Sequence, residues 1–202
     1  MIYDISSSST QTEATLAGIQ MWAQYFPKVY FNSVYLNGIG NGANPEGSGA
    51  LYVYNNCEIV DVKNNILINT RDESPYCASS IYFYGNYNMI HSNNNDLYYV
   101  QNQSNCLVRS TGGDYFTLTE WKSTGQDGNS ISEKPFFVGP HLHMNRHVPT
   151  NIESGAIPLS GICTDCDGEL RHITTPDIGA DEFFGKKPPP TSVNEDILVP
   201  DN

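Results

Sequence analysis

The sequence predicts an all-β protein wound as a right-handed parallel β-helix of a few coils, with an irregular C-terminal cap. Short alternating runs of apolar and polar residues recur about 30 residues apart, as in ALYVYNN (50–56) and SIYFYGN (80–86). Paired asparagines stand at matching places after these runs, at 64–65 and 94–95. Strands of about four to five residues with corners between them suit stacked coils better than a meander of hairpins.

Length and composition agree with a single all-β domain, or one domain with an appendage. The chain has 202 residues, enough to bury a sizeable core, and only 16% of them are charged. Its 13 tyrosines and 8 phenylalanines exclude a disordered acidic chain. The many Asn, Ser, Thr and Gly residues are typical of short strands joined by polar turns.

The repeat predicts which side chains face the interior. A shift of 30 residues superimposes 51–54 on 81–84, and a shift of 32 superimposes 19–22 on 51–54. Side chains alternate between the two faces of a strand. The residues predicted to point inward are Ile19, Met21, Leu51, Val53, Ile81 and Phe83.

Asparagine at matching corners predicts a hydrogen-bonded ladder. Asparagine tolerates a left-handed backbone, and its amide can bond to the amide of an asparagine one coil above. The shift of 32 places residues 32–37 on 64–69, so the predicted ladder consists of Asn32, Asn64 and Asn94. The alternative is that these asparagines are ordinary turn residues.

The outward positions form an aromatic surface. Alternation places Trp22, Tyr54 and Tyr84 in one outward column. Gln20, Tyr52 and Tyr82 form the next. Sugar rings and neighbouring protein chains both stack on exposed aromatic rings. The residues predicted to bind a carbohydrate or a partner are therefore Trp22, Tyr52, Tyr54, Tyr82 and Tyr84. The alternative is that the stacked rings only stabilise the sheet.

The charge balance excludes some partners. The 22 acidic and 10 basic residues give a net charge of −12, so nucleic acid and anionic membrane surfaces are poor partners. Neutral polysaccharides, other protein chains and divalent cations are more compatible with this negative charge. No apolar run is long enough to span a membrane, and the first residues, MIYDISSSST, predict no export signal in this chain.

The chain resembles a known family, most specifically in its second half. TLTEWKSTGQDGNSI (117–131), HLHMN (141–145), DCDGELR (165–171) and TTPDIGADEFFG (174–185) follow one another in the chain. In this order they resemble the C-terminal end of secreted bacterial right-handed parallel β-helix proteins, of the choice-of-anchor or pectate-lyase-like type. The resemblance covers nearly all of residues 1–185. It implies the fold and an extracellular or cell-surface location, since family members are commonly the ends of large surface proteins.

Three regions are expected. Residues 1–112 form the coils, residues 113–185 form the last coil and the C-terminal cap, and residues 186–202 form a Pro-rich linker or tail. KPPP in this tail predicts a stiff polyproline spacer. The alternative is that the tail docks on a neighbouring chain through its apolar residues ILV at 197–199.

The PDIGADEF segment is expected to fold over the open end of the coils. Unpaired backbone groups at such an end invite aggregation, and a covering segment would satisfy them. We expect Arg171 to pair with Asp177, Asp181 or Glu182 and so hold the segment down.

Several motifs point to metals or thiols. Asp165, Asp167 and Glu169 alternate like a fragment of a calcium loop, but the full twelve-residue loop is absent, which favours a turn held by Asp side chains over calcium. His141 and His143 would point to one side of a strand, with His147 nearby and no evident third ligand.

The five cysteines include one CxxC motif, Cys163 to Cys166, where the family usually carries aliphatic or small residues. An odd cysteine count argues against a complete disulfide framework. No second CxxC is present, so a local disulfide or two spare thiols are favoured over zinc.

No catalytic residue is predicted. Hydrolysis would need paired carboxylates, and elimination a basic residue with calcium. Lys63, Arg71, His91 and Lys122 are the candidates near the coils, and they share no register. The sequence therefore favours a non-catalytic segment that acts in adhesion, carbohydrate binding or extracellular assembly, including self-assembly through stacked ends. The alternative is an excerpt of a polysaccharide lyase or glycoside hydrolase.

Overall fold

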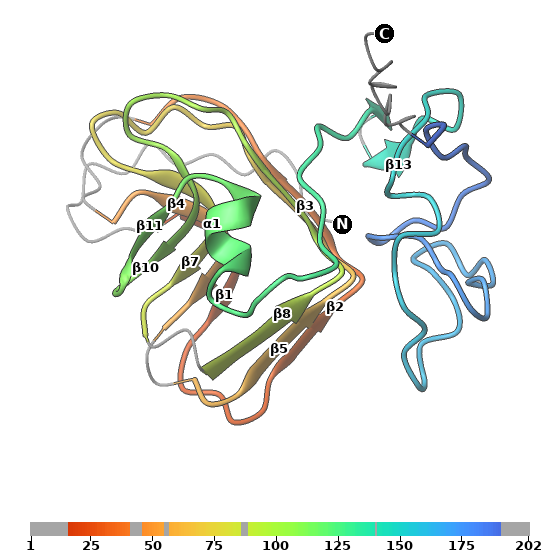
Figure 1. The fold of residues 1–202 in the computed structure, drawn as a ribbon, viewed down its shortest axis with the longest axis horizontal. Helices are drawn as coiled ribbons and strands as arrows, with labels where there is room; N and C mark the ends of the chain where they lie inside the picture. The colour runs from red at the N-terminus through yellow and green to blue at the C-terminus, as the bar shows by residue number, and fades with distance from the viewer. Residues whose placement is uncertain (1–15, 41–45, 55–56, 86–88, 140, 191–202) are drawn as a thin grey trace, which may run out of the picture.

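The structure, a computed structural model, describes residues 16–40, 46–54, 57–85, 89–139 and 141–190. It consists mostly of strands, with almost no helix, and its main sheets are parallel (Figure 1). The predicted all-β class is confirmed. The part of the predicted tail beyond residue 190 and the start of the first predicted coil lie outside the described residues.

Three successive stretches, here called repeats, each contribute one strand to each of three sheets. Repeat 1 contains β1 (Leu16–Met21), β2 (Lys28–Tyr30) and β3 (Ser33–Leu36). Repeat 2 contains β4 (Ser48–Val53), β5 (Val60–Lys63) and β6 (Ile66–Asn69). Repeat 3 contains β7 (Ala78–Phe83), β8 (Ile90–Asn93) and β9 (Asp96–Tyr99). The sheets run β1-β4-β7-β10-β11, β2-β5-β8 and β3-β6-β9, and every pairing between repeats is parallel.

The registers confirm one predicted shift and correct the other. Leu51 lies opposite Ile81, a shift of 30 residues that also holds for the other two sheets. Between repeats 1 and 2 the shift is 32 only for β1 and β4, where Ile19 lies opposite Leu51. It becomes 33 for the next two strands, with Val34 opposite Leu67. Repeat 2 therefore has one more residue between Val53 and Asp61 than repeat 1 has between their partners, Met21 and Lys28.

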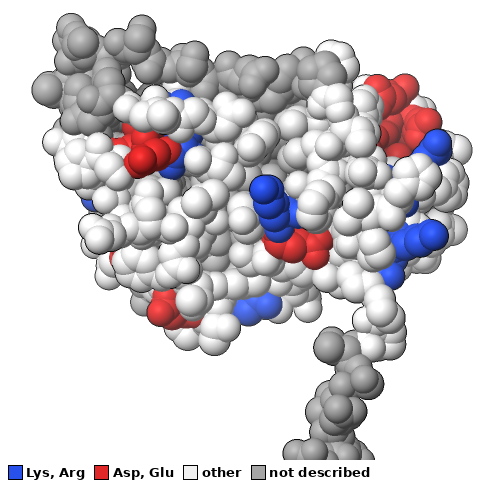
Figure 2. Space-filling model, turned by 90° about the horizontal axis from the view of Figure 1, so that it is seen from above, with Lys and Arg blue, Asp and Glu red and all other residues white. Residues whose placement is uncertain are grey.

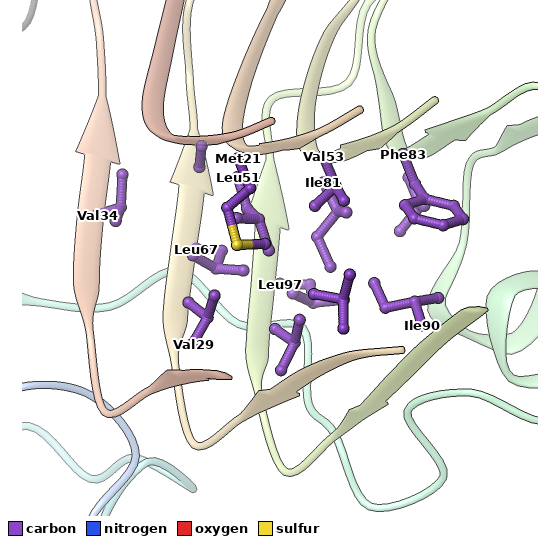
Figure 3. Packing of buried hydrophobic residues seen from close by; sticks show 14 of the residues in the cluster. Met21, Val29, Val34, Leu51, Val53, Leu67, Ile81, Phe83, Ile90 and Leu97 are labelled. Atoms are coloured by element: carbon purple, nitrogen blue, oxygen red, sulfur yellow. The ribbon is translucent and has the colours of Figure 1, made fainter. Parts of the chain in front are cut away.

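The three sheets enclose one apolar core. Leu51, Val53 and Ile81 are fully buried and Phe83 and Met21 nearly so, as alternation predicted. Figure 3 shows these side chains facing residues of the other two sheets, among them Val29, Val34, Leu67, Ile90 and Leu97. Burying each such side chain stabilises the fold by about 1.5–3 kcal/mol.

The asparagine ladder exists, but it runs one residue later than predicted. Asn32 Nδ2 donates to Asn65 Oδ1, and Asn65 Nδ2 donates to Asn95 Oδ1, both at 3.0 Å. The backbone N–H groups of Asn32 and Asn65 donate to the same two oxygens. The ladder prediction was right for Asn32 and wrong for Asn64 and Asn94, because the extra residue in repeat 2 moves the register by one.

The two asparagines of each pair have different roles. Asn64 and Asn94 take the left-handed turn, with φ of 60° and 55°, which asparagine tolerates better than most residues. Their amides point away from the ladder, donating to Ile157 O at 2.8 Å and to Gly155 O at 3.3 Å. The first asparagine thus turns the chain, and the second joins one repeat to the next.

Asp127 ends the ladder. Asn95 Nδ2 donates to Asp127 Oδ1 at 3.0 Å, and Trp121 Nε1 donates to Asp127 Oδ2 at 2.6 Å. The hydroxyl of Ser130 also donates to this carboxylate. A fully buried carboxylate is stable here because each of its oxygens accepts a hydrogen bond.

The end of the repeats is covered by the only helix of the described residues. After β10 (Cys106–Ser110) and its antiparallel partner β11 (Gly113–Tyr115), α1 (Leu118–Lys122) lies across the sheets (Figure 1). A capping box between Thr117 and Glu120 begins the helix. Trp121 is fully buried in the core of the repeats. Within the described ranges, no helix has the length and hydrophobicity to cross a membrane.

The PDIGADEF segment lies beside β3 and β6 rather than over the end (Figure 1). Ala180 N donates to Ser33 Oγ at 2.9 Å, and Gly179 N donates to Asn64 O at 2.8 Å. Gly179 has a φ of +100°, and a Cβ there would lie 2.6 Å from Ile66 Cδ1, so only glycine fits. The predicted position of this segment is therefore wrong. Such a segment can hydrogen-bond to the side of a sheet as well as to its end, and the sequence does not distinguish the two places.

Ion pairing and strand pairing hold this C-terminal segment together. β12 (Phe137–Val138) pairs with β13 (His143–Met144) in antiparallel fashion. Arg171 Nη1 lies 3.2 Å from Glu182 Oε2, which confirms one of the three predicted pairings. The guanidinium carbon of Arg171 also lies 3.9 Å from the ring centroid of Phe31 in repeat 1. Arg171 thus ties the segment to the repeats.

Two buried carboxyl groups make stability depend on pH. Asp96 is fully buried at the start of β9, and burial raises its pKa well above the usual range. Burial also raises the pKa of Asp177 to about 7. Between about pH 4 and these raised pKa values, the folded protein holds protons that the unfolded chain has released. The stability that these groups contribute is therefore complete below about pH 4 and is lost as the pH rises.

We expect the free energy of unfolding of the unmodified protein, relative to Asp96→Asn, to fall by up to about 1.4 kcal/mol per pH unit as the pH rises above about 4. Denaturant unfolding at several pH values measures this difference. Asp72 is the control: it is exposed, and hydrogen bonds from Ser74 lower its pKa. The difference for Asp72→Asn should stay flat over this range. A flat difference for Asp96→Asn as well would contradict the prediction.

Candidate functional site: an aromatic column

Three aromatic side chains stand directly after β1, β4 and β7. Hydrogen bonds from Tyr54 N to Met21 O at 3.1 Å and from Tyr84 N to Val53 O at 2.7 Å keep them in register. The ring centroids of Trp22 and Tyr54 lie 4.3 Å apart, and those of Tyr54 and Tyr84 lie 6.4 Å apart. Trp22, Tyr54 and Tyr84, here called the aromatic column, therefore form the stack that alternation predicted.

The aromatic column is open to solvent. Trp22 is 57% exposed and Tyr84 is 40% exposed, with Tyr54 partly buried between them. The rings are tilted by 43° and 49° to one another rather than stacked flat. Because of this tilt and exposure, apolar ring surface remains free for a ligand at both ends of the column.

The second predicted column points outward but is buried. Tyr52 is 1% exposed and Tyr82 is 6% exposed. Both hydroxyls donate to Glu46 Oε2, at 3.3 and 2.9 Å, so Glu46 lies against them. The prediction that Tyr52 and Tyr82 contact a ligand is wrong, because alternation determines the face of a strand and not what covers that face.

The buried pair supports the aromatic column. The Tyr52 ring centroid lies 4.8 Å from that of Tyr54 and 4.4 Å from that of Tyr82. Burial raises the pKa of Tyr82 to about 12, and burial also raises the pKa of Tyr52, so both hydroxyls remain donors at neutral pH. The guanidinium carbon of Arg109 lies 5.3 Å from the Tyr82 centroid. These contacts fix the rings on which Tyr54 rests.

One face of the molecule carries few charges. Figure 2 shows a face of the molecule on which acidic and basic side chains lie in small separate groups, surrounded by uncharged residues. A broad anionic or cationic ligand would find little to bind on that face. Apolar and hydrogen-bonding contacts are what this surface offers.

The candidate catalytic residues occupy other places. Lys63 Nζ lies 2.9 Å from Asp61 Oδ1, and the Tyr30 hydroxyl donates to the same carboxylate. Burial and Asp61 raise the pKa of Tyr30 to about 12. This cluster holds one carboxylate and therefore lacks the pair that glycoside hydrolysis needs.

Two of the other basic candidates have structural partners, and the third lies next to this cluster. Arg71 is buried with Glu73, at 2.5 Å between Nε and Oε1. Lys122 Nζ donates to Ser130 O at 2.9 Å. His91 lies exposed on β8, opposite Asp61.

The predicted calcium trio is not assembled as three ligands around one point. Asp165 Oδ1 accepts from Asp167 N at 2.9 Å and from Glu169 N at 2.8 Å, and Asp165 Oδ2 accepts from Glu182 N at 3.0 Å. Asp165 therefore holds the turn, as the favoured interpretation predicted. The carboxylate of Glu169 belongs to neither group of mutually close metal-ligating atoms in the described residues.

His143 has acidic neighbours that the sequence did not predict. Its Nδ1 lies 3.2 Å from Asp181 Oδ1 and 3.5 Å from Asp167 Oδ2. The hydrogen bond with Asp181 raises the pKa of His143. His141 lies 6.4 Å from His143 between ring centroids and contributes no ligand atom to this group. These contacts join β13 to Asp167 and Asp181 by an ion pair when His143 is protonated, and the same three side chains place their ligand atoms close enough together to hold a metal ion.

Several residues of this surface and core carry signals that sequence reasoning passed over. Asp127 stands in the quoted GQDGN motif, and Asn65 and Asn95 are the second members of their pairs. Glu46 gives no signal, since nothing local marks it as the partner of two tyrosines.

Comparisons with protein-family models, with curated proteins and with solved structures found no match.

Proposed function

We propose that this chain is a segment of a right-handed parallel β-helix in a secreted or cell-surface protein. Three parallel sheets with one strand per repeat, and an amide ladder along the corners, support this winding. The resemblance of the 117–131 and 174–185 motifs supports the extracellular location. Such a segment is a rigid support for a binding surface.

We propose further that the segment is non-catalytic and binds a neutral polysaccharide along the aromatic column. The observation that carries this proposal is the exposure of Trp22 and Tyr84 at the two ends of one stack. Neighbouring strands lie about 4.8 Å apart, so the rings repeat along the stack at a spacing comparable to that of a sugar unit. Apolar faces of pyranose rings stack on aromatic rings, and adhesion to a glycan surface would follow from several such contacts.

Trp22→Ala combined with Tyr84→Ala tests the proposal. We expect affinity for a neutral glycan to fall at least about tenfold, equivalent to about 1.4 kcal/mol. Affinity electrophoresis against hydroxyethyl cellulose, xylan and mixed-linkage glucan, all soluble, measures retardation of the native protein. Both side chains are exposed, so the thermal unfolding midpoint should change little, and measuring it separates lost binding from lost structure.

Phe136→Ala combined with Phe184→Ala is the matched control, because both rings are exposed, at 52% and 95%, and lie outside the column. It should leave binding unchanged. Equal binding by the Trp22 and Tyr84 variant, or no binding by the unmodified protein to any neutral glycan, would remove the proposal. Release of sugar products from any of these polymers would favour the enzyme alternative instead.

A further inference from the structure

Cys77 and Cys106 place their sulfur atoms 2.8 Å apart in the interior. The two residues are 5% and 0% exposed. This separation exceeds the S–S bond length of about 2.05 Å by less than about 0.8 Å. We infer that Cys77 and Cys106 form a disulfide bond that joins the start of repeat 3 to β10.

The backbone holds Cys77 in place on the side of repeat 2. Cys77 O accepts a hydrogen bond from Ser48 N at 3.0 Å. Gly47 packs so closely that a Cβ on it would lie 1.9 Å from the same oxygen. Cys77 therefore has little freedom to move away from Cys106.

The backbone on the other side is held by a buried amide. Asn105, which directly precedes Cys106, is fully buried, and its Oδ1 accepts from Ala78 N at 3.0 Å. Its Nδ2 donates to Arg71 O at 3.0 Å and to Val100 O at 3.1 Å. The residues next to the two cysteines are thus bonded to each other, and the S–S bond would form with only a small adjustment of the side chains.

The chemistry is thiol–disulfide exchange with a small disulfide such as oxidised glutathione. The hydrogen bond from Cys106 lowers the pKa of the Cys77 thiol, while the same contact and burial raise the pKa of Cys106. The Cys77 thiolate attacks glutathione disulfide and releases one glutathione thiolate, which takes up the Cys77 proton. Cys106 then loses its proton, attacks the mixed disulfide and releases the second glutathione. Two cysteine thiols are oxidised and one glutathione disulfide is reduced to two thiols.

The bond would close repeat 3 into a covalent ring. Cys77 lies just before β7, and Cys106 is the first residue of β10, the strand that follows repeat 3 in the same sheet. A cross-link between these points restricts the unfolded chain and so stabilises the last repeat against opening. Bonds of this kind persist in oxidising compartments, which agrees with the proposed location but does not depend on glycan binding.

The test uses the full chain with Cys163→Ser and Cys166→Ser. These two thiols are exposed and would add to the number of alkylated cysteines. Protein folded with oxidised and reduced glutathione is unfolded without reductant, alkylated with iodoacetamide and digested. Trypsin leaves both cysteines in one peptide, residues 72–109, so chymotrypsin is used to cut at the tyrosines between them. We expect alkylation of Cys57 alone and a two-chain peptide that links Cys77 to Cys106.

Reduction supplies a second measurement. Adding reductant should lower the thermal unfolding midpoint of this variant by several degrees, and it should not change the midpoint when Cys77→Ser is added. The further control Cys57→Ser should leave the linked peptide in place, although Cys57 is also buried. Alkylation of all three remaining cysteines, or a bridge that includes Cys57, would overturn the inference.

Discussion

Trp121→Ala is expected to lower the free energy of unfolding by about 3 to 5 kcal/mol, the range for truncating a buried Phe or Trp. Among the described residues Trp121 is the largest fully buried side chain, and it packs at the end of the core that the repeats enclose. Its ring lies 5.1 Å from that of Tyr115 between centroids. Removal would leave a cavity at the point where α1 covers the sheets.

The Trp121→Ala substitution would also remove a hydrogen bond to the buried carboxylate of Asp127. Trp121 Nε1 donates to Asp127 Oδ2 at 2.6 Å, so the alanine variant leaves this oxygen without that donor. A buried group that loses its partner costs about 1 to 3 kcal/mol. Trp121→Phe separates the two effects, because it keeps much of the ring volume and removes only the donor. It should cost less than Trp121→Ala and more than zero.

Denaturant unfolding followed by circular dichroism measures these changes. Trp22→Ala is the matched control, since the only other tryptophan is 57% exposed and should cost little. The same variant leaves Trp121 as the single tryptophan, so its fluorescence reports the covered end directly. A loss below about 1 kcal/mol for Trp121→Ala would show that α1 does not close the core.

Asn95→Ala is expected to cost about 3 to 5 kcal/mol, because several buried groups lose partners at about 1 to 3 kcal/mol each. Asn95 Oδ1 accepts from both the backbone N–H and the Nδ2 of Asn65. Asn95 Nδ2 donates to Val62 O and to Asp127 Oδ1, both at 3.0 Å. Alanine removes all of these bonds at a side chain that is fully buried.

Asn129→Ala is the control for this change, because Asn129 is exposed and only its backbone N–H donates to Asn93 Oδ1. Equilibrium unfolding in urea compares the two variants. Asn94→Ala is a second comparison, since Asn94 lies outside the ladder and turns the chain with a φ of 55°. We expect Asn95→Ala to be the most destabilising of the three. Equal costs for Asn95→Ala and Asn129→Ala would show that the ladder contributes no stability.

Local backbone geometry explains why part of the fold was predictable. Side chains alternate in a strand wherever it lies, so the inward positions of Leu51, Val53 and Ile81 followed from the sequence. The repeat of 30 residues followed from matching runs, and so did the stack of Trp22, Tyr54 and Tyr84. The separation of Cys77 and Cys106 by 29 residues is close to this repeat and could have indicated their contact.

Register and docking were less predictable. One extra residue between Val53 and Asp61 moved the ladder from Asn64 to Asn65. The sequence on either side is compatible with both alignments. The motif with Gly179 was recognisable, but its place beside Ser33 depends on contacts between segments nearly 150 residues apart. Such contacts leave no local pattern in the chain.

The sequence by itself determined the strand pattern, the repeat, the faces of the strands and the excess of acidic residues. Only the tertiary structure decided that Tyr52 and Tyr82 are covered, that Asp127 ends the ladder, and that α1 rather than PDIGADEF closes the core. The physical reason is that alternation and turn formation depend on a few neighbouring residues. Burial and hydrogen-bond partners depend on which distant segments arrive at the same place.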